Sequence, residues 1–207
     1  VTIAAGAVCR SITVAGPASG NVTFTSNGAW SVYGSFTLPS TGITWSYAGT
    51  ITFAATTTGW TITTNGIGIG TIVFNGVGGG WTLGSALSIG SNTGTLVFVN
   101  GSFDTGNYSV SAAAFQTSGT ATKSVTLGSS TITLGGGSAW VFSTTTGLTF
   151  SAGTSTITLS AATQVFSGGG LTYYNVTQSS TASGTLTITG ANTYNNLTFT
   201  SRAADGN

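Results

Sequence analysis

The hexapeptide TTGWTI at residues 57–62 carries the pattern that decides the fold. In it a glycine is followed by a large apolar residue, a threonine and a second apolar residue. The same phrase recurs as STGITW at 40–45, GGGWTL at 78–83, TTGLTF at 145–150 and GGGLTY at 168–173. Aligning the apolar-Thr-apolar triplets gives a period of about 22 residues. A fixed period of this size is the signature of a repeat architecture.

A second phrase in each unit alternates polar and apolar residues. It reads SITV at 11–14, TITF at 50–53, TIVF at 71–74, TLVF at 95–98, TITL at 131–134 and 156–159, and TLTI at 185–188. Alternation with β-branched residues is typical of a half-buried strand. The NG, GGG and NTG clusters between these phrases favour turns, because Gly and Asn tolerate positive φ. The chain is therefore predicted to be all-β.

A unit of about 22 residues holds two or three short strands and their turns, which is one coil of a parallel β-helix. We predict such a β-solenoid, with the glycine at a corner, the next apolar residue inward and the threonine outward. Equivalent inward residues should then form one column: Ile43, Trp60, Trp81, Leu148 and Leu171. A β-sandwich of short hairpins is the alternative, because its turn signals are also regular. It is less favoured, since hairpins do not require the same hexapeptide in successive units.

The whole of residues 1–207 is expected to be a single repeat domain, part of a longer chain or assembly. The stretch 102–124 matches the repeat least well, which leaves room for a bulge out of the stack. The tail SRAADGN at 201–207 breaks the pattern and is expected to be a frayed end or the lead into further sequence.

Charged residues make up only 2% of the chain, and the net charge is +1. Such a surface offers no electrostatic footprint for nucleic acid or for an anionic membrane. No window approaches the roughly 18 uninterrupted apolar residues of a membrane-spanning helix. We therefore expect neither a nucleic-acid partner nor membrane insertion.

An enzyme needs convergent reactive groups, and the chain has no histidine. Its two acids, Asp104 and Asp205, would lie about 20 Å apart in a straight solenoid, too far for a glycosidase pair at about 5–9.5 Å. Asp104 in FDTGN is better explained as a turn residue. Cys9 beside Arg10 could have a lowered thiol pKa, but an inward, inert cysteine is the preferred interpretation. No enzymatic activity, metal or cofactor is expected.

Aromatic residues could stack on sugars, although Trp60 and Trp81 are better explained as core residues. Tyr173 and Tyr174 are adjacent, so in a strand one of them faces outward as a candidate glycan contact. Asn-x-Ser/Thr sequons give candidate N-glycosylation sites at Asn21, Asn107, Asn175 and Asn196, although a chain rich in Asn and Thr produces such matches by chance.

Ice binding is the least favoured function. Outward Thr-x-Thr pairs in TITF, TITL and TLTI would stack into a flat array able to order water. TIVF and TLVF put valine at the second outward site, which would interrupt that array.

A series of stretches over about residues 43–200 resembles repeat-rich proteins of tailed bacteriophages: ITFAATTTGWTITTNG, TIVFNGVGGGWTL, LVFVNGSFDTGNYSVSAAAF, VFSTTTGLTFSAGTSTITL, SGGGLTYYNVT and TITGANTYNNLTFT. Those proteins are usually taken to be virion fibre or tail components, and similar low-charge repeats occur in secreted bacterial adhesins. The resemblance implies an extracellular or virion-surface structural protein that serves as a spacer or recognition element. Its partners would be further copies, other virion or surface proteins, or host glycans. The alternative is a filament-forming or glycan-binding adhesin, which would gather exposed aromatics on one face.

Overall fold

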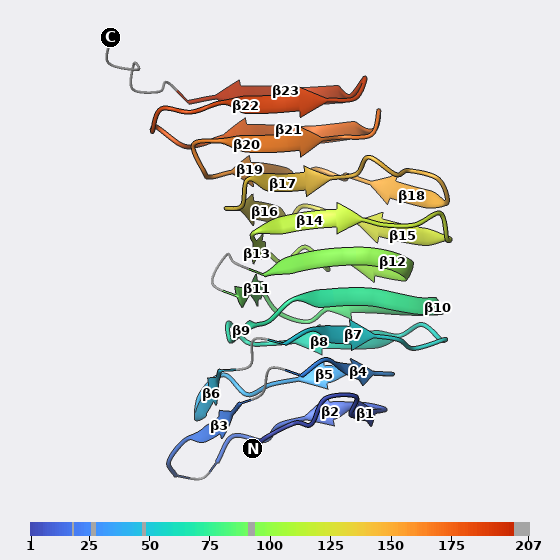
Figure 1. Ribbon diagram of the computed structural model, residues 1–207, viewed down its shortest axis with the longest axis vertical. Coiled ribbons are helices and arrows are strands. Elements are labelled where there is room, and N and C mark those ends of the chain that lie inside the picture. Colours follow the sequence, from blue (N-terminus) through green and yellow to red (C-terminus); the bar gives the residue numbers. More distant parts are fainter. Residues whose placement is uncertain (18, 26–27, 47–48, 91–93, 201–207) are drawn as a thin grey trace.

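The computed structural model describes residues 1–17, 19–25, 28–46, 49–90 and 94–200. These residues wind into a β-solenoid of about eight turns, with coils about 22 residues apart (Figure 1). Ladder pairings between successive coils are parallel from β1 at one end to β23 at the other. This confirms the predicted parallel β-helix and excludes a sandwich of hairpins, in which neighbouring strands are antiparallel.

The coils present three outer faces, which we call face one, face two and face three. Face one contains β1 (Val8–Cys9), β4 (Trp30–Val32), β7 (Ile51–Phe53), β10 (Ile72–Leu83), β12 (Thr95–Asp104), β14 (Ala114–Thr117), β17 (Ser138–Val141), β20 (Gln164–Ser167) and β22 (Leu186–Thr189). Face two contains β2 (Ile12–Thr13), β5 (Phe36–Thr37), β8 (Trp60–Thr63), β15 (Lys123–Thr126), β18 (Leu148–Ser151) and the second halves of β10 and β12.

Face three contains β9 (Gly68–Ile69), β11 (Leu87–Ile89), β13 (Val110–Ala112), β16 (Thr131–Leu134), β19 (Thr156–Leu159), β21 (Thr172–Gln178) and β23 (Thr193–Phe199). β3 (Val22–Phe24) and β6 (Ile43–Trp45) form a separate two-stranded sheet in the first two coils. The long strands β10 and β12 join faces one and two into one branched sheet (Figure 1). No helix in the described ranges is long and apolar enough to cross a membrane.

The core is a stack of aromatic rings that continues from coil to coil. Phe74 lies above Phe53 and below Phe98 in the face-one ladder, and the Phe74 and Phe98 ring centroids are 4.9 Å apart. Higher in the stack, the centroids of Phe115 and Trp140 are 4.8 Å apart. Such ring pairs add about 0.5–1.5 kcal/mol each beyond the burial of their area. Alternation along each strand supplies this core, because successive side chains point to opposite faces.

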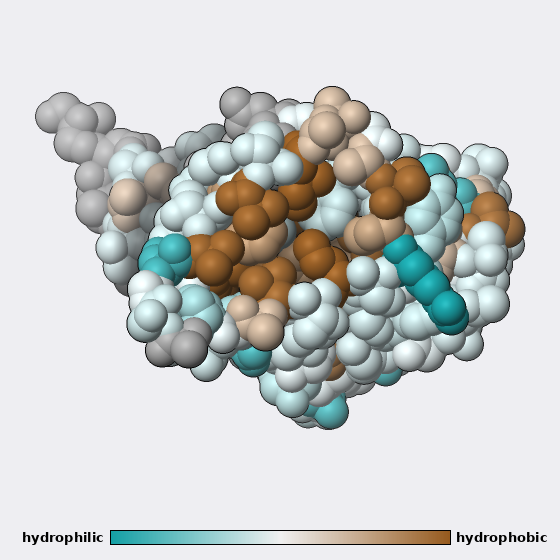
Figure 2. All heavy atoms as spheres, turned by 90° about the horizontal axis from the view of Figure 1, so that it is seen from below, coloured by the Kyte–Doolittle hydropathy of each residue, from teal (hydrophilic) through white to brown (hydrophobic). Residues whose placement is uncertain are grey.

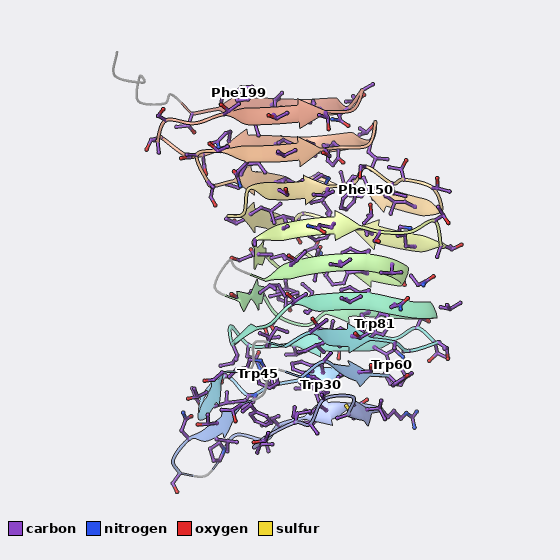
Figure 3. The ribbon with its side chains drawn as sticks, in the orientation of Figure 1. Trp30, Trp45, Trp60, Trp81, Phe150 and Phe199 are labelled. Carbon is purple, nitrogen blue, oxygen red and sulfur yellow. The ribbon has the colours of Figure 1, made fainter. Side chains whose placement is uncertain are left out.

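Trp60 and Trp81 lie one rung apart, as predicted (Figure 3). The column that they begin continues through Phe103, Val125 and Phe150.

The other predicted members of that column, Ile43, Leu148 and Leu171, are wrong. Ile43 pairs with Val22 in the β3–β6 sheet, Leu148 is level with Lys123, and Leu171 precedes β21 on face three. The phrase marks a corner wherever it occurs, but the number of residues in the neighbouring corners varies. Residues at the same place in the phrase therefore do not always belong to the same column of the stack.

The predicted corner glycines are supported by the backbone. Gly59 and Gly147, which precede Trp60 and Leu148, have φ of 92° and 70°. At Gly147 an added Cβ would also lie 2.6 Å from the Ala121 carbonyl oxygen. Both conformation and space therefore require glycine at this corner.

The stretch 102–124 does not bulge from the stack, contrary to the expectation from sequence. β12, β13, β14 and β15 all pair with the coils on either side. Phe103, Val110 and Phe115 from this stretch are buried in the core. The segment lacks the repeat phrase but keeps the alternation, and alternation is what fills the core.

The Thr-rich phrases divide between faces, so the single threonine array considered from sequence is wrong: TITF and TLTI lie on face one, where valine interrupts the column, and only the two TITL phrases lie on face three. The valines of TIVF and TLVF, Val73 and Val97, stand on face one above Thr52. Both TITL phrases lie on face three, where Thr133 is paired with Thr158. Alternation of period two is the same on every face, so the sequence pattern could not separate them.

Candidate functional site

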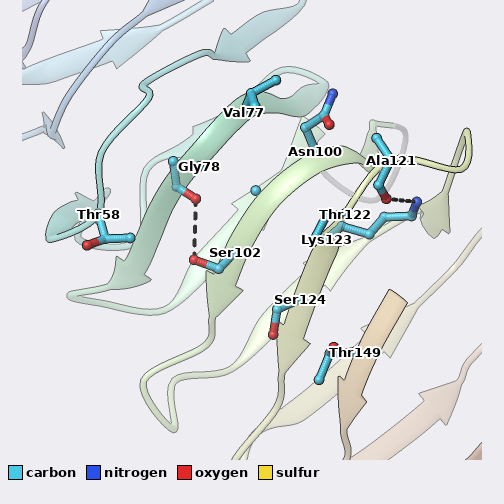
Figure 4. A pocket seen from close by; sticks show the side chains of 12 residues that line it. Thr58, Val77, Gly78, Asn100, Ser102, Ala121, Thr122, Lys123, Ser124 and Thr149 are labelled. Atoms are coloured by element: carbon cyan, nitrogen blue, oxygen red, sulfur yellow. Dashed lines mark hydrogen bonds between the residues drawn. The ribbon is translucent and has the colours of Figure 1, made fainter. Parts of the chain in front are cut away.

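A groove of about 450 Å³ crosses face two where β10 and β12 pass from face one (Figure 4). β10 carries a register shift between Asn75 and Gly80 at this point, in the segment NGVGGG. Thr58 from the coil below and Thr122 from the coil above line the two sides. The groove therefore lies where the glycine-rich corners of two neighbouring coils lie side by side.

The floor of the groove is bare backbone with a few hydroxyl groups. Gly78, Gly79 and Gly101 line it, and Gly101 has a φ of 86°. An added Cβ at Gly101 would lie 2.7 Å from the Gly76 carbonyl oxygen, so this position requires glycine. The Ser102 hydroxyl donates to the Gly79 carbonyl at 3.3 Å. The floor can offer hydrogen bonds to a neutral ligand and allows it a close approach.

Lys123 is the charged residue of this lining, but its ammonium group is already occupied. The side chain is 1% exposed, and Nζ donates to the carbonyl oxygens of Gly119 and Ala121, both at 2.9 Å (Figure 4). Burial lowers the pKa of this group. The lysine closes the turn between β14 and β15, and it does not present charge to the groove.

A second hollow on face two contains the carboxylate of Asp104. Asp104 Oδ1 accepts a hydrogen bond from the backbone N–H of Gly106 at 2.8 Å. This confirms that Asp104 stabilises a turn. Asp205 lies outside the described residues, so the distance between the two acids stays a prediction. The described part of the chain contains no group of three or more His, Cys, Asp or Glu residues that could hold a metal.

Tyr173 and Tyr174 point to opposite sides of β21, as predicted. Tyr173 is 1% exposed; its hydroxyl accepts from Trp140 Nε1 at 2.9 Å and donates to the Gly168 carbonyl at 2.7 Å. Burial raises the pKa of Tyr173 well above its usual value. Tyr173 therefore cannot be the glycan contact considered from sequence. Tyr174 is 36% exposed and lines a shallow hollow on the upper coils.

Cys9 packs against the core from β1, and burial raises the pKa of its thiol. A raised pKa reduces the thiolate fraction, which is the reverse of what a reactive cysteine needs. The Arg10 guanidinium lies 5.7 Å from the Trp60 ring centroid, in cation–π contact. This geometry supports the inert interpretation of Cys9.

The four sequon asparagines include residues that take part in the hydrogen bonding of the stack. Asn107 has a φ of 66°, and its Oδ1 accepts from the backbone N–H of Ser129 at 2.9 Å. Asn196 Nδ2 donates to Asn175 Oδ1 at 2.8 Å. Asn21 is exposed and donates to Thr44 Oγ1. Glycosylation at these positions stays a prediction.

Comparison with protein-family models, with curated proteins and with solved structures gave no match. The resemblance to phage repeat proteins therefore rests on the repeat phrases alone.

Sequence reasoning missed the face-two groove. The glycine run at 78–80 predicts only a turn at the start of the repeat phrase GGGWTL. The available signal was the glycine cluster at 76–80 together with the Asn-Gly pair at 100–101, one coil later. Glycines at the same corner of two neighbouring coils leave no side chains to fill that corner, which indicates a groove.

Proposed function

We propose that this chain is a non-enzymatic structural protein, a stiff β-solenoid segment of an extracellular assembly such as a virion fibre or tail. The observation that supports this most is the unbroken face-one ladder, which runs from β1 to β22 over one continuous core. Each coil contacts chiefly its neighbours, so the hydrogen bonds and the aromatic stack both run along the long axis. A spacer or surface-recognition element needs this resistance to bending.

The ends of the described stack support a role in assembly. β1, β2 and β3 pair only with the coil above them, and β22 and β23 only with the coil below. Apolar residues are exposed there, including Val8 at 68% and Phe199 at 59%. Figure 2 looks onto the first coil and shows a broad apolar patch. Unpaired strand edges of this kind pair readily with further strands.

Further sequence of a longer chain or a neighbouring copy could cover these ends, and the partner that we propose is a second copy, placed head to tail. A copy in that orientation continues the parallel strand direction, so β22 of one copy would meet β1 of the next. The net charge of +1 provides little repulsion against this contact. Contacts of this heterologous type propagate into filaments when they do not close into a ring.

Light scattering and electron microscopy of the pure chain test this proposal. We expect elongated particles whose length grows with protein concentration. Val8→Lys should reduce association by placing a charge on the edge strand. Val77→Lys is the matched control, because Val77 is 72% exposed on the groove rim, away from both ends. A stable, compact monomer at high concentration and moderate salt would refute the proposed assembly.

The adhesin alternative receives less support from the exposed aromatic residues. Tyr33, Tyr108 and Tyr174 are 45%, 43% and 36% exposed. Tyr33 follows β4 near one end, Tyr108 precedes β13 in the middle and Tyr174 lies on β21 near the other end (Figure 1). These described tyrosines do not gather into one sugar-stacking platform.

A further inference from the structure

We propose that face three is an ice-binding surface, which presents a regular array of hydroxyl and amide groups to the ice lattice. This inference goes beyond the structural role proposed above and does not depend on it.

The array consists of two neighbouring columns of outward side chains. The first column runs through successive partners on β11, β13, β16, β19, β21 and β23: Ser88, Ser111, Thr133, Thr158, Thr177 and Thr198. The second stands two residues earlier on the last four strands: Thr131, Thr156, Asn175 and Asn196. Their inward neighbours, such as Ile132 and Ile157, are buried, which fixes both columns on the outside.

The spacings of the array are set by the sheet. Neighbouring strands lie about 4.8 Å apart, and residues two apart in a strand lie about 6.7 Å apart. Both repeats are close to oxygen repeats on a prism face of hexagonal ice. A two-dimensional match lets many hydroxyl groups engage the lattice together, although each contact by itself is weak.

Hydrogen bonds link three side chains of the second column to one another. Asn196 Nδ2 donates to Asn175 Oδ1 at 2.8 Å, and Asn175 Nδ2 donates to Thr156 Oγ1 at 3.2 Å. This hydrogen-bonded chain runs along the second column. Threonine is β-branched, so its χ1 is restricted and its methyl and hydroxyl positions repeat from rung to rung. Little side-chain entropy is then lost when water orders on the face.

On the other two faces, the corresponding column of described residues is interrupted. The corresponding face-two column contains the Asp104 carboxylate between Thr82 and Thr126. A carboxylate orients water around itself in a way that does not fit ice. The face-one column contains Val73 and Val97, which carry no hydroxyl group. Both described columns of face three are uncharged, and the first carries a hydroxyl group on every rung from Ser88 to Thr198.

Thermal hysteresis and inhibition of ice recrystallisation, measured on the full chain, test the inference. The wild type should show both activities. Thr158→Lys, at the centre of the array, should abolish them by placing a long charged side chain among the hydroxyl groups. Thr52→Lys is the matched control, since Thr52 occupies an equivalent half-buried outward position on β7 of face one. Circular dichroism melting must show that each variant is folded.

Thr198→Lys, on the exposed last strand, supplies a second test if Thr158→Lys does not fold. Loss of activity in the face-three variants together with full activity in Thr52→Lys supports the inference. A wild type without ice activity overturns it, as does equal loss or equal retention in the face-three and control variants. Co-sedimentation with crystalline chitin in the absence of any ice activity would also overturn it and would assign the face to polysaccharide.

Discussion

Replacing Trp81 by alanine should lower the free energy of unfolding by about 4–6 kcal/mol. Trp81 is 1% exposed and packs against Phe53 and Phe74, with ring centroids 5.7 and 5.4 Å away. Removing a buried aromatic of this size costs about 3–5 kcal/mol through lost transfer energy and the remaining cavity. Trp81 Nε1 also donates to the Gly34 carbonyl at 3.1 Å, and the loss of that bond adds about 1 kcal/mol.

Urea unfolding followed by circular dichroism gives the size of this effect. Trp81→Phe keeps a ring but removes the N–H donor, so it should cost about 1–3 kcal/mol. Trp60→Ala, one rung below, is the matched control, because Trp60 is only half-buried and should cost clearly less. If Trp81→Ala melted at the wild-type temperature, the proposed inward register of face two would be wrong.

Substitutions at three further residues test other parts of the stack. Tyr173→Phe leaves the buried Trp140 N–H without an acceptor and should cost about 1–3 kcal/mol in urea unfolding. Burial raises the pKa of Tyr173, so the unfolded state loses its proton first and the tyrosine's contribution to stability falls as pH rises above about 10. Tyr173→Phe should reduce this alkaline loss, and an unchanged pH slope would contradict the assigned burial. Lys123→Met removes the donor to two turn carbonyls and should lower the unfolding free energy by about 1–3 kcal/mol. If this variant were as stable as the wild type, the lysine would not close the turn. Asp104→Ala should cost about 1 kcal/mol by removing the acceptor for Gly106, whereas Asp104→Asn should cost less; equal losses would rule out the turn bond.

Several features of the fold could be predicted from residue patterns. The repeated phrase gave the coil length, because a parallel stack requires each coil to return to the same corner. Adjacent strand positions gave the opposite directions of Tyr173 and Tyr174, since side chains alternate across a sheet. The Trp60–Trp81 rung followed from two phrases that share the triplet Gly-Trp-Thr and are separated by one coil.

Features that depend on corner length could not be predicted. Leu148 has the same place in its phrase as Trp60 has in TTGWTI. It nevertheless pairs with Lys123, and Phe150, two residues later, occupies the column of Trp60. Period-two alternation also reads the same on all three faces, so Thr52 and Thr158 could not be assigned to different sheets from sequence. The face-two groove depends on both effects, because it forms where glycine corners of adjacent coils coincide.

The rung spacing along face three tests the solenoid account most directly. Pairs of spin labels can be attached at cysteines placed at Ser88 and Thr198, or at Ser111 and Thr198, in a chain with Cys9 replaced by serine. The first pair is separated by five rungs and the second by four, through the pairings of β11, β13, β16, β19, β21 and β23. Pulsed electron paramagnetic resonance should give distances centred near about 24 Å and about 19 Å, which differ by one strand spacing. Distances that are equal, or that fail to increase by about one strand spacing, would contradict parallel stacking of the coils.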